Sequence, residues 1–131
     1  MKPEVVSLAE RIRESGDYRW VGIYAVGRHE ISVIGWSGPS APTHPRFPKD
    51  RGLCGAAAAS GRMVVVNDVA KDPRYLETLT TTRSEIVVPV KRPSGEVVGM
   101  IDVASDKPDA FGSEDRRKLK EFALRAADLW K

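Results

Sequence analysis

The sequence has few of the residues that cross-link small proteins or bind metals in them. It contains one cysteine, Cys54, and two histidines, His29 and His44, among 131 residues. One cysteine cannot form a disulfide within the chain, and both histidines stand alone in polar, turn-like sequence. Because no cluster has metal-ligand spacing, we interpret both histidines as surface residues. The sequence predicts a fold without disulfide, metal or cofactor.

Long apolar runs and an excess of one charge are also missing. No stretch approaches the ~20 apolar residues that cross a bilayer, and residues 1–14 lack the apolar core of a signal peptide. The 21 basic and 18 acidic residues are interspersed, and the basic run at 116–120 lacks interleaved aromatics. We therefore expect a soluble, cytoplasmic protein that binds neither membrane nor nucleic acid.

The rest of the pattern predicts a single α+β domain over residues 1–131. Apolar side chains recur at helical spacing near both ends, in 3–15 and from 113 onwards. Two hairpins are predicted between these helices, with strands at 18–26, 31–36, 84–91 and 96–105, and a short strand at 63–67. We expect an antiparallel sheet with both terminal helices on one face and loops on the other. The paired terminal helices suggest a homodimer.

Two segments between these elements read as irregular. Residues 38–50 contain four prolines, which exclude a central strand or helix and indicate an ordered loop at a binding site. Residues 68–82 are polar, with one helical turn expected at 73–79. Ser113 is expected to cap the last helix.

The stretch from Pro48 to Gly61 predicts a short helix with Cys54 in its first turn. The amide groups and dipole of a helix N-terminus can hold an anion or favour a thiolate. A lone cysteine among small apolar residues is more often a buried, unreactive side chain. The sequence leaves both interpretations open.

Two further pairs of residues are candidates for a site. Trp20 and Tyr24 flank Gly22 on one face of the first strand, which leaves a notch for a ligand or for another part of the chain. Glu85 and Asp102 interrupt apolar strands, where a carboxylate needs a partner. That partner is a donor group on a ligand, an arginine of the protein or an amide of one of its loops.

Several motifs together resemble the GAF domain. They are W-V-G-I-Y, D-R-G-L-C-G-A-A, N-D-V, S-E-I-V-V-P-V, G-E-V-V-G-M-I-D-V-A-S and F-G-S-E-D, in this order from about Trp20 to Trp130. They look most like the branch that includes free methionine-(R)-sulfoxide reductases. The resemblance implies a GAF/PAS-like central antiparallel sheet, with terminal helices on one face and a short helix and pocket loops on the other.

The resemblance also implies roles for single residues. Trp20 and Tyr24 match the aromatic walls of the substrate pocket, and Glu85 matches the acidic residue that contacts substrate. Asp102 matches the first of two pocket aspartates, whereas Ala104 replaces the second.

The three cysteines of the reductases are matched only once, by Cys54. His44 stands at the position of a second cysteine, and Thr78 stands at the position of the one that attacks the sulfoxide. Threonine cannot form the sulfenic acid that this reaction requires. This departure favours a binding domain over an enzyme.

The leading hypothesis is thus a stand-alone GAF domain with a sensory or regulatory role that binds a small, amino-acid-like molecule. Its expected site residues are Trp20, Tyr24, Trp36, Glu85 and Asp102. One alternative is a methionine-(R)-sulfoxide reductase that acts through Cys54 and an external thiol. The other is a catalytically inactive dimerisation module with a filled pocket.

Overall fold

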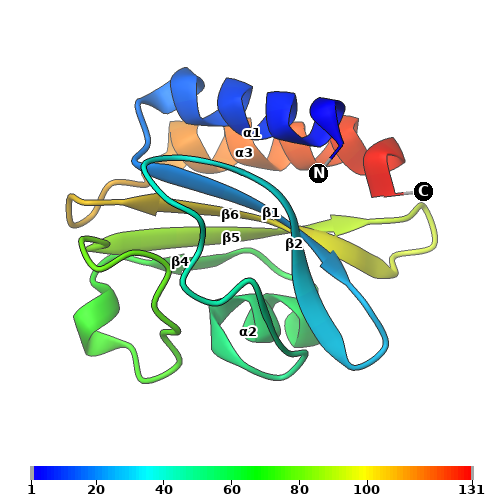
Figure 1. Cartoon of the computed structure of the whole chain (residues 1–131), viewed down its shortest axis with the longest axis horizontal. Coiled ribbons are helices and arrows are strands. Elements are labelled where there is room, and N and C mark those ends of the chain that lie inside the picture. Colours follow the sequence, from blue (N-terminus) through cyan, green and yellow to red (C-terminus); the bar gives the residue numbers. More distant parts are fainter. Residues whose placement is uncertain (1, 131) are drawn as a thin grey trace.

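A six-stranded antiparallel sheet forms the centre of the molecule in this computed structural model, which describes residues 2–130 (Figure 1). The strands lie in the order β3-β2-β1-β6-β5-β4. Their bounds are β1 Trp20–Val26, β2 Glu30–Ser37, β3 Arg46–Pro48, β4 Val64–Val66, β5 Ser84–Lys91 and β6 Val97–Ser105. The helices are α1 Pro3–Gly16, α2 Gly52–Ser60 and α3 Ser113–Ala126, with 3₁₀ turns η1 Val69–Lys71 and η2 Ala127–Trp130.

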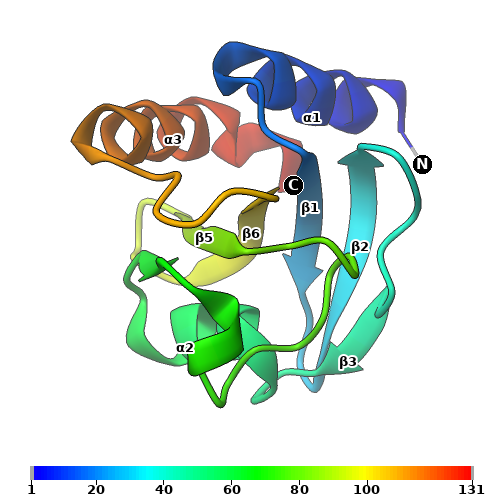
Figure 2. The same cartoon turned by 90° about the vertical axis from the view of Figure 1, so that its left-hand side faces the viewer.

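The helices divide between the two faces of the sheet. Figure 2 shows α1 and α3 together on one face and α2 on the opposite face. The apolar stripe of α1 and the buried residues of α3 pack against the side chains of β1, β5 and β6 that point to this face of the sheet. The predicted α+β fold, with its terminal helices on one face, is confirmed.

A second apolar cluster lies on the α2 face and supports the candidate site. Its fully or nearly fully buried members come from β1, β2, α2, β4, β5, β6 and the 68–82 loop: Trp20, Tyr24, Ile31, Leu53, Cys54, Ala57, Val66, Val69, Leu79, Val87, Met100 and Ala104. Strand alternation puts Glu85 and Asp102 on this face too. They are diagonal neighbours, because Glu85 pairs with Ala104 and Asp102 with Val87.

The 38–50 segment is more regular than the sequence predicts. Arg46–Pro48 forms β3, which pairs with the first residues of β2 at the edge of the sheet. Proline is tolerated there because an edge strand needs only one of its two rows of hydrogen bonds. The expectation of an irregular loop therefore holds only for the residues before β3.

Two local predictions at helical turns are wrong. The turn in the 68–82 loop is η1 and not residues 73–79, because the Asp68 carboxylate accepts a hydrogen bond from the Ala70 amide and starts it earlier. Gly112 and not Ser113 is the N-cap of α3, and the Asp115 carboxylate accepts from the Gly112 amide at 3.0 Å.

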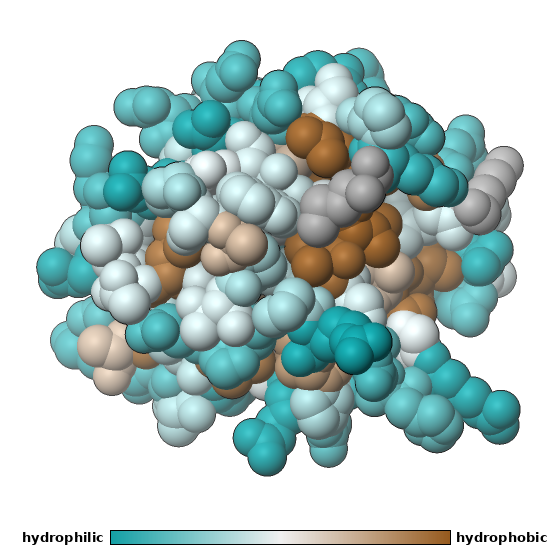
Figure 3. Space-filling model, in the orientation of Figure 1, coloured by the Kyte–Doolittle hydropathy of each residue, from teal (hydrophilic) through white to brown (hydrophobic). Residues whose placement is uncertain are grey.

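Most of the surface in the view of Figure 1 is hydrophilic, and an apolar area lies over the β1–β2 side (Figure 3). β2 is covered only along its first residues by the short β3, so Val33, Ile34 and Trp36 stay half-buried. Among the described residues, no helix is both long and apolar enough to cross a membrane.

Candidate functional site

A small hollow lies between the sheet, α2 and the two middle loops. Its volume is about 20 Å³, which is room for about one water molecule. The lining residues are Tyr24, Pro42, His44, Phe47, Leu53, Cys54, Leu76, Glu77, Thr78, Glu85 and Asp102. Four of the residues singled out from the sequence, Tyr24, Cys54, Glu85 and Asp102, therefore meet here.

Glu85 and Asp102 are each only 2% exposed. Within residues 2–130, Glu85 Oε1 and Asp102 Oδ1 are the buried side-chain nitrogen or oxygen atoms without a hydrogen-bond partner. Neither carboxyl group forms an ion pair with an arginine of the described chain. Buried carboxyl oxygens without partners are costly for folding. Of the partners that the sequence leaves open, an arginine of the described chain is therefore excluded for both carboxyl groups, and a loop amide is excluded for these two oxygens.

Burial sets the ionisation of this carboxyl pair. Loss of solvation raises the pKa of Asp102 from 3.8 to about 6, although interactions with Glu85 and Cys54 oppose this rise. Loss of solvation, followed by the charge of Asp102, raises the pKa of Glu85 well above its ordinary value. The two groups titrate as a pair, because a proton on one favours ionisation of the other. They therefore retain a proton at pH values where exposed carboxyl groups have lost theirs.

Cys54 lies in the first turn of α2, as predicted, and its Sγ is 3.7 Å from Asp102 Oδ2. The thiol is 4% exposed. Burial, and then the charges of Asp102 and Glu85, raise the pKa of the Cys54 thiol well above its usual range. Of the two interpretations of Cys54, the structure supports the buried side chain and not the thiolate, since burial outweighs the helix dipole.

The three aromatic candidates do not all line the hollow. Tyr24 lines the hollow, whereas Trp20 and Trp36 lie in the surrounding apolar cluster. The Trp20 ring lies over Gly22, where an added Cβ would be 2.2 Å from Trp20 Cη2. Its indole N–H donates to the Ser40 carbonyl at 3.1 Å. The notch beside Gly22 is thus filled by the chain itself.

Tyr24 is held from the opposite face of the sheet. The indole N–H of Trp130 donates to the Tyr24 carbonyl at 2.8 Å. This contact lies beside an irregularity in the β1–β2 pairing, where the register shifts between Ile23 and Tyr24. The Trp130 ring fits because residue 99 is glycine, and an added Cβ there would be 1.8 Å from the indole nitrogen.

His44 is less exposed than the surface position that the sequence predicts for it. His44 is half-buried and lines the hollow, as does Thr78, which is 6% exposed. The only advance signal for this pair was the resemblance, which put His44 and Thr78 at cysteine positions of the reductases. All three of those positions line one hollow here.

Thr43 joins the two loops that close the hollow. Its amide and its hydroxyl both donate to the Thr78 carbonyl, at 3.3 and 2.9 Å. A free amino acid is much larger than 20 Å³, so it can enter only if these loops separate. The Thr43–Thr78 bonds are the direct polar link that such a movement breaks.

We therefore predict that Thr43→Val makes Cys54 more reactive. Loss of one hydrogen bond, worth about 0.5–1.5 kcal/mol net, should raise the population of the open loops and the rate of Cys54 alkylation by iodoacetamide roughly 2- to 10-fold. Mass spectrometry over time measures this rate. Thr81→Val, an exposed position in the same loop, is the control and should react like the wild type. Equal rates in all three proteins would contradict the prediction.

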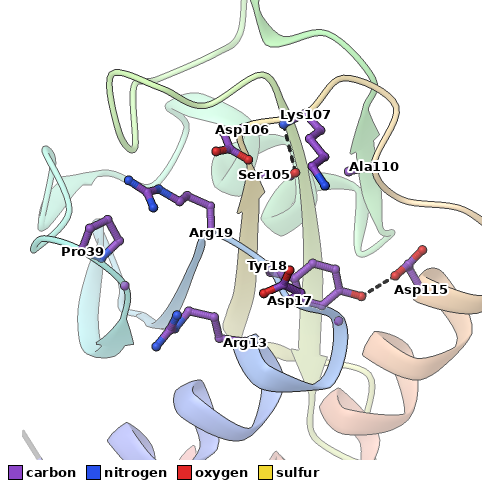
Figure 4. A pocket seen from close by; sticks show the side chains of 12 residues that line it. Arg13, Asp17, Tyr18, Arg19, Pro39, Ser105, Asp106, Lys107, Ala110 and Asp115 are labelled. Carbon is purple, nitrogen blue, oxygen red and sulfur yellow. Dashed lines mark hydrogen bonds between the residues drawn. The ribbon is translucent and has the colours of Figure 1, made fainter.

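Larger hollows lie on the surface and have a different character. A groove of about 650 Å³ runs beside the α1–β1 turn and includes Arg13, Arg19 and Lys107 together with Asp17, Asp106 and Asp115 (Figure 4). Its opposite charges are balanced, and Asp115 is already engaged by the Tyr18 hydroxyl and the Gly112 amide. Among residues 2–130, no cluster of histidine, cysteine, aspartate and glutamate could hold a metal ion.

Comparison with known proteins assigns a family to this fold. A profile of the GAF domain matches residues 3–130. The chain belongs to the GAF domain family.

Free methionine-R-sulfoxide reductases are among the relatives of this GAF domain. It is 33% identical to the type II free methionine-R-sulfoxide reductase from Thermoplasma acidophilum, with a TM-score of 0.91 over 97% of this chain and 89% of that one. It is also 33% identical to the enzyme from Neisseria meningitidis solved with its substrate, with a TM-score of 0.86 over 95% and 74%.

A further relative is GAF domain-containing protein A of Dictyostelium discoideum. It is 32% identical over 119 residues, which cover 90% of this chain and 73% of that protein. The GAF domain spans between 60% and 73% of the lengths of the five curated relatives compared.

Proposed function

We propose that this GAF domain binds a free amino-acid sulfoxide, methionine-R-sulfoxide, and reduces it through Cys54 with an external thiol as reductant. The observation that carries the proposal is the position of Cys54: its Sγ faces the same hollow as the two unpartnered carboxyl oxygens, 3.7 Å from Asp102. The kinship with free methionine-R-sulfoxide reductases supports the choice of substrate. The sequence alone favours binding without chemistry, whereas here reduction is the first candidate function.

Binding follows from the two acids. The ammonium group of an amino acid supplies hydrogen-bond donors and a positive charge for Glu85 Oε1 and Asp102 Oδ1. It also offsets the two charges that, after burial, raise the pKa of the Cys54 thiol. Arrival of the substrate therefore favours the thiolate, while Asp102 Oδ2 is the nearest carboxylate oxygen to accept the thiol proton.

The reaction balances with one cysteine. The sulfur of Cys54 attacks the sulfoxide sulfur and forms an S–S bond to it. This bond and the S–O bond of the substrate then break as the oxygen moves to the Cys54 sulfur, and the proton that Asp102 accepted returns to that oxygen, which gives a sulfenic acid. The substrate leaves as a thioether, reduced by two electrons, and Cys54 is oxidised by two. An external thiol then forms a mixed disulfide with release of water, and a second thiol restores Cys54.

A second candidate function is binding without reduction. It is favoured by Thr78, which stands at the position of the attacking cysteine of the reductases, and by the raised pKa of Cys54. Such a domain would serve as a sensor of the amino acid. The two candidates share the site and differ only in whether Cys54 reacts.

Turnover distinguishes the candidates. The wild-type protein is incubated with free methionine-R-sulfoxide and dithiothreitol, and methionine is measured against a protein-free control. The proposal predicts enzyme-dependent methionine. Calorimetric binding without methionine formation would support the sensor, particularly if Thr78→Cys gained turnover. If the protein neither binds nor reduces methionine-R-sulfoxide, both candidates are contradicted.

The homodimer through the terminal helices and the cytoplasmic location stay predictions. The upper surface of Figure 3, where Figure 1 places α1, is largely hydrophilic, whereas Leu124 on α3 is 72% exposed. Sedimentation velocity over a range of concentrations tests the dimer. A monomer-sized species throughout would contradict it.

A further inference from the structure

His44 is the one residue lining the hollow that can carry a positive charge. Its neighbours there include three acids, Glu77, Glu85 and Asp102. The acids on the sheet suit the ammonium end of an amino acid, but they repel its carboxylate. A site for the whole zwitterion therefore needs a donor on a different wall. His44 comes from the loop after β2, not from the sheet that carries Glu85 and Asp102.

The backbone on both sides of His44 is fixed. Thr43 donates twice to the Thr78 carbonyl, and the Pro45 carbonyl accepts a hydrogen bond from the Val33 amide of β2 at 2.8 Å. Prolines at 42 and 45 further restrict the chain, and Pro42 is buried. The Thr43–Thr78 bonds break when the loops separate, so the restriction that remains in the ligand-bound state comes from the Pro45–Val33 bond and the two prolines. It lowers the loss of conformational entropy of His44 on binding.

The His44 imidazole is nevertheless without a partner in the protein. It forms no hydrogen bond, ion pair or ring contact with any other residue in 2–130. The chain thus holds an unused N–H donor at the same hollow as two unused carboxyl oxygens. The arrangement is complementary to a molecule with opposite charges at one end.

We propose that His44 binds the α-carboxylate of the amino-acid ligand and makes the site select amino acids over the corresponding amines. The inference rests on the proposed function, since it assigns the carboxylate end of the same ligand. It assigns a role to His44, which stands where the resemblance implies a cysteine.

The test changes the protein at His44 and also removes the carboxylate from the ligand. Calorimetry measures the affinity of wild type and His44→Ala for methionine-R-sulfoxide and for its decarboxylated analogue, the R epimer of 3-(methylsulfinyl)propylamine. His44→Ala should weaken binding of the amino acid about 10- to 100-fold, the loss of a hydrogen bond to a charged group. Binding of the amine should not change. His44→Gln, which keeps an N–H donor, should recover part of the loss.

His29→Ala is the matched control, because it removes the other histidine from an exposed turn. It should bind both compounds like the wild type. Equal weakening of both compounds by His44→Ala, or weakening of neither, would overturn the role of His44 and leave the proposed function standing. Equal wild-type affinities for the amino acid and the amine would do the same. If the wild type binds neither the amino acid nor the amine, both proposals are overturned.

Discussion

Replacing Cys54 by serine abolishes reduction of free methionine-R-sulfoxide in our account and leaves binding of the sulfoxide nearly unchanged. Cys54 is the only sulfur nucleophile in the chain that can form a sulfenic acid, and a serine hydroxyl cannot take its place. Serine has a similar size and keeps a hydrogen-bond donor toward Asp102, so the ligand contacts of the acids stay intact. We therefore expect loss of kcat to the protein-free background, with calorimetric affinity within a few-fold of wild type.

The control for this prediction is Thr78→Val. Thr78 occupies the position of the attacking cysteine in the reductases, and its hydroxyl shares a hydrogen bond with the Thr82 hydroxyl, at 3.0 Å. Valine keeps its shape, and the backbone carbonyl that accepts from Thr43 remains. Thr78→Val should therefore retain most of the turnover. Equal turnover in wild type and Cys54→Ser would show that Cys54 takes no part.

The second large effect is on stability. Asp102→Asn should make the protein more stable at pH 8 by about 3 kcal/mol, because the wild type must ionise a buried carboxyl group there. The native pKa of Asp102, about 6, lies above its usual 3.8, so the folded state binds this proton more tightly than the unfolded state. Its contribution is therefore fully present below pH ~4 and is lost as the pH rises through 6, with each pKa unit worth about 1.4 kcal/mol.

Urea unfolding at pH 4 and pH 8 measures this difference. The wild type should lose stability between the two values, and the loss should be smaller in Asp102→Asn, where Glu85 is the one buried carboxyl group of the pair that still titrates. Asp106→Asn, an exposed acid just beyond the same strand, is the control and should follow the wild type. Asp102→Asn should also bind methionine-R-sulfoxide more weakly. No gain at pH 8 would contradict the destabilising burial of the Asp102 carboxyl group.

Stability gained together with affinity lost would mark Asp102 as a residue kept for function. Natural sites often retain groups that weaken the fold, because those groups have their partner only when ligand is bound. A purely structural acid would behave in the opposite way. Its removal would leave another buried group without a partner and would destabilise the protein.

Much of the fold follows from patterns that act over short distances. The period of α1 and α3 and the two hairpins are local properties, and their apolar faces determine which side of the sheet each helix covers. The pairing of β3 with β2 is not visible in the sequence, because three residues at a sheet edge carry no alternation that distinguishes them from loop. Likewise, the Asp68 side chain and not an apolar pattern determines where η1 begins.

The site is predictable only in part, for a related reason. Strand alternation and an acid in an apolar strand were enough to select Tyr24, Glu85 and Asp102, since regular strands place side chains at known positions. His44 lies in a loop, where no period relates a residue to a face, and its position depends on the distant partners Thr78 and Val33. The filling of the notch beside Gly22 by the Trp20 ring also could not be predicted, because it depends on the side-chain conformation of Trp20.

One measurement tests the central claim that Cys54 receives the oxygen of a bound sulfoxide. Reduced protein is mixed with one equivalent of free methionine-R-sulfoxide without any other thiol, and both the products and the Cys54 peptide are analysed by mass spectrometry. Our account predicts methionine approaching one equivalent and one added oxygen on Cys54, trapped as a sulfenic acid, whereas the S epimer gives neither. Unchanged sulfoxide together with an unmodified Cys54 thiol would contradict it.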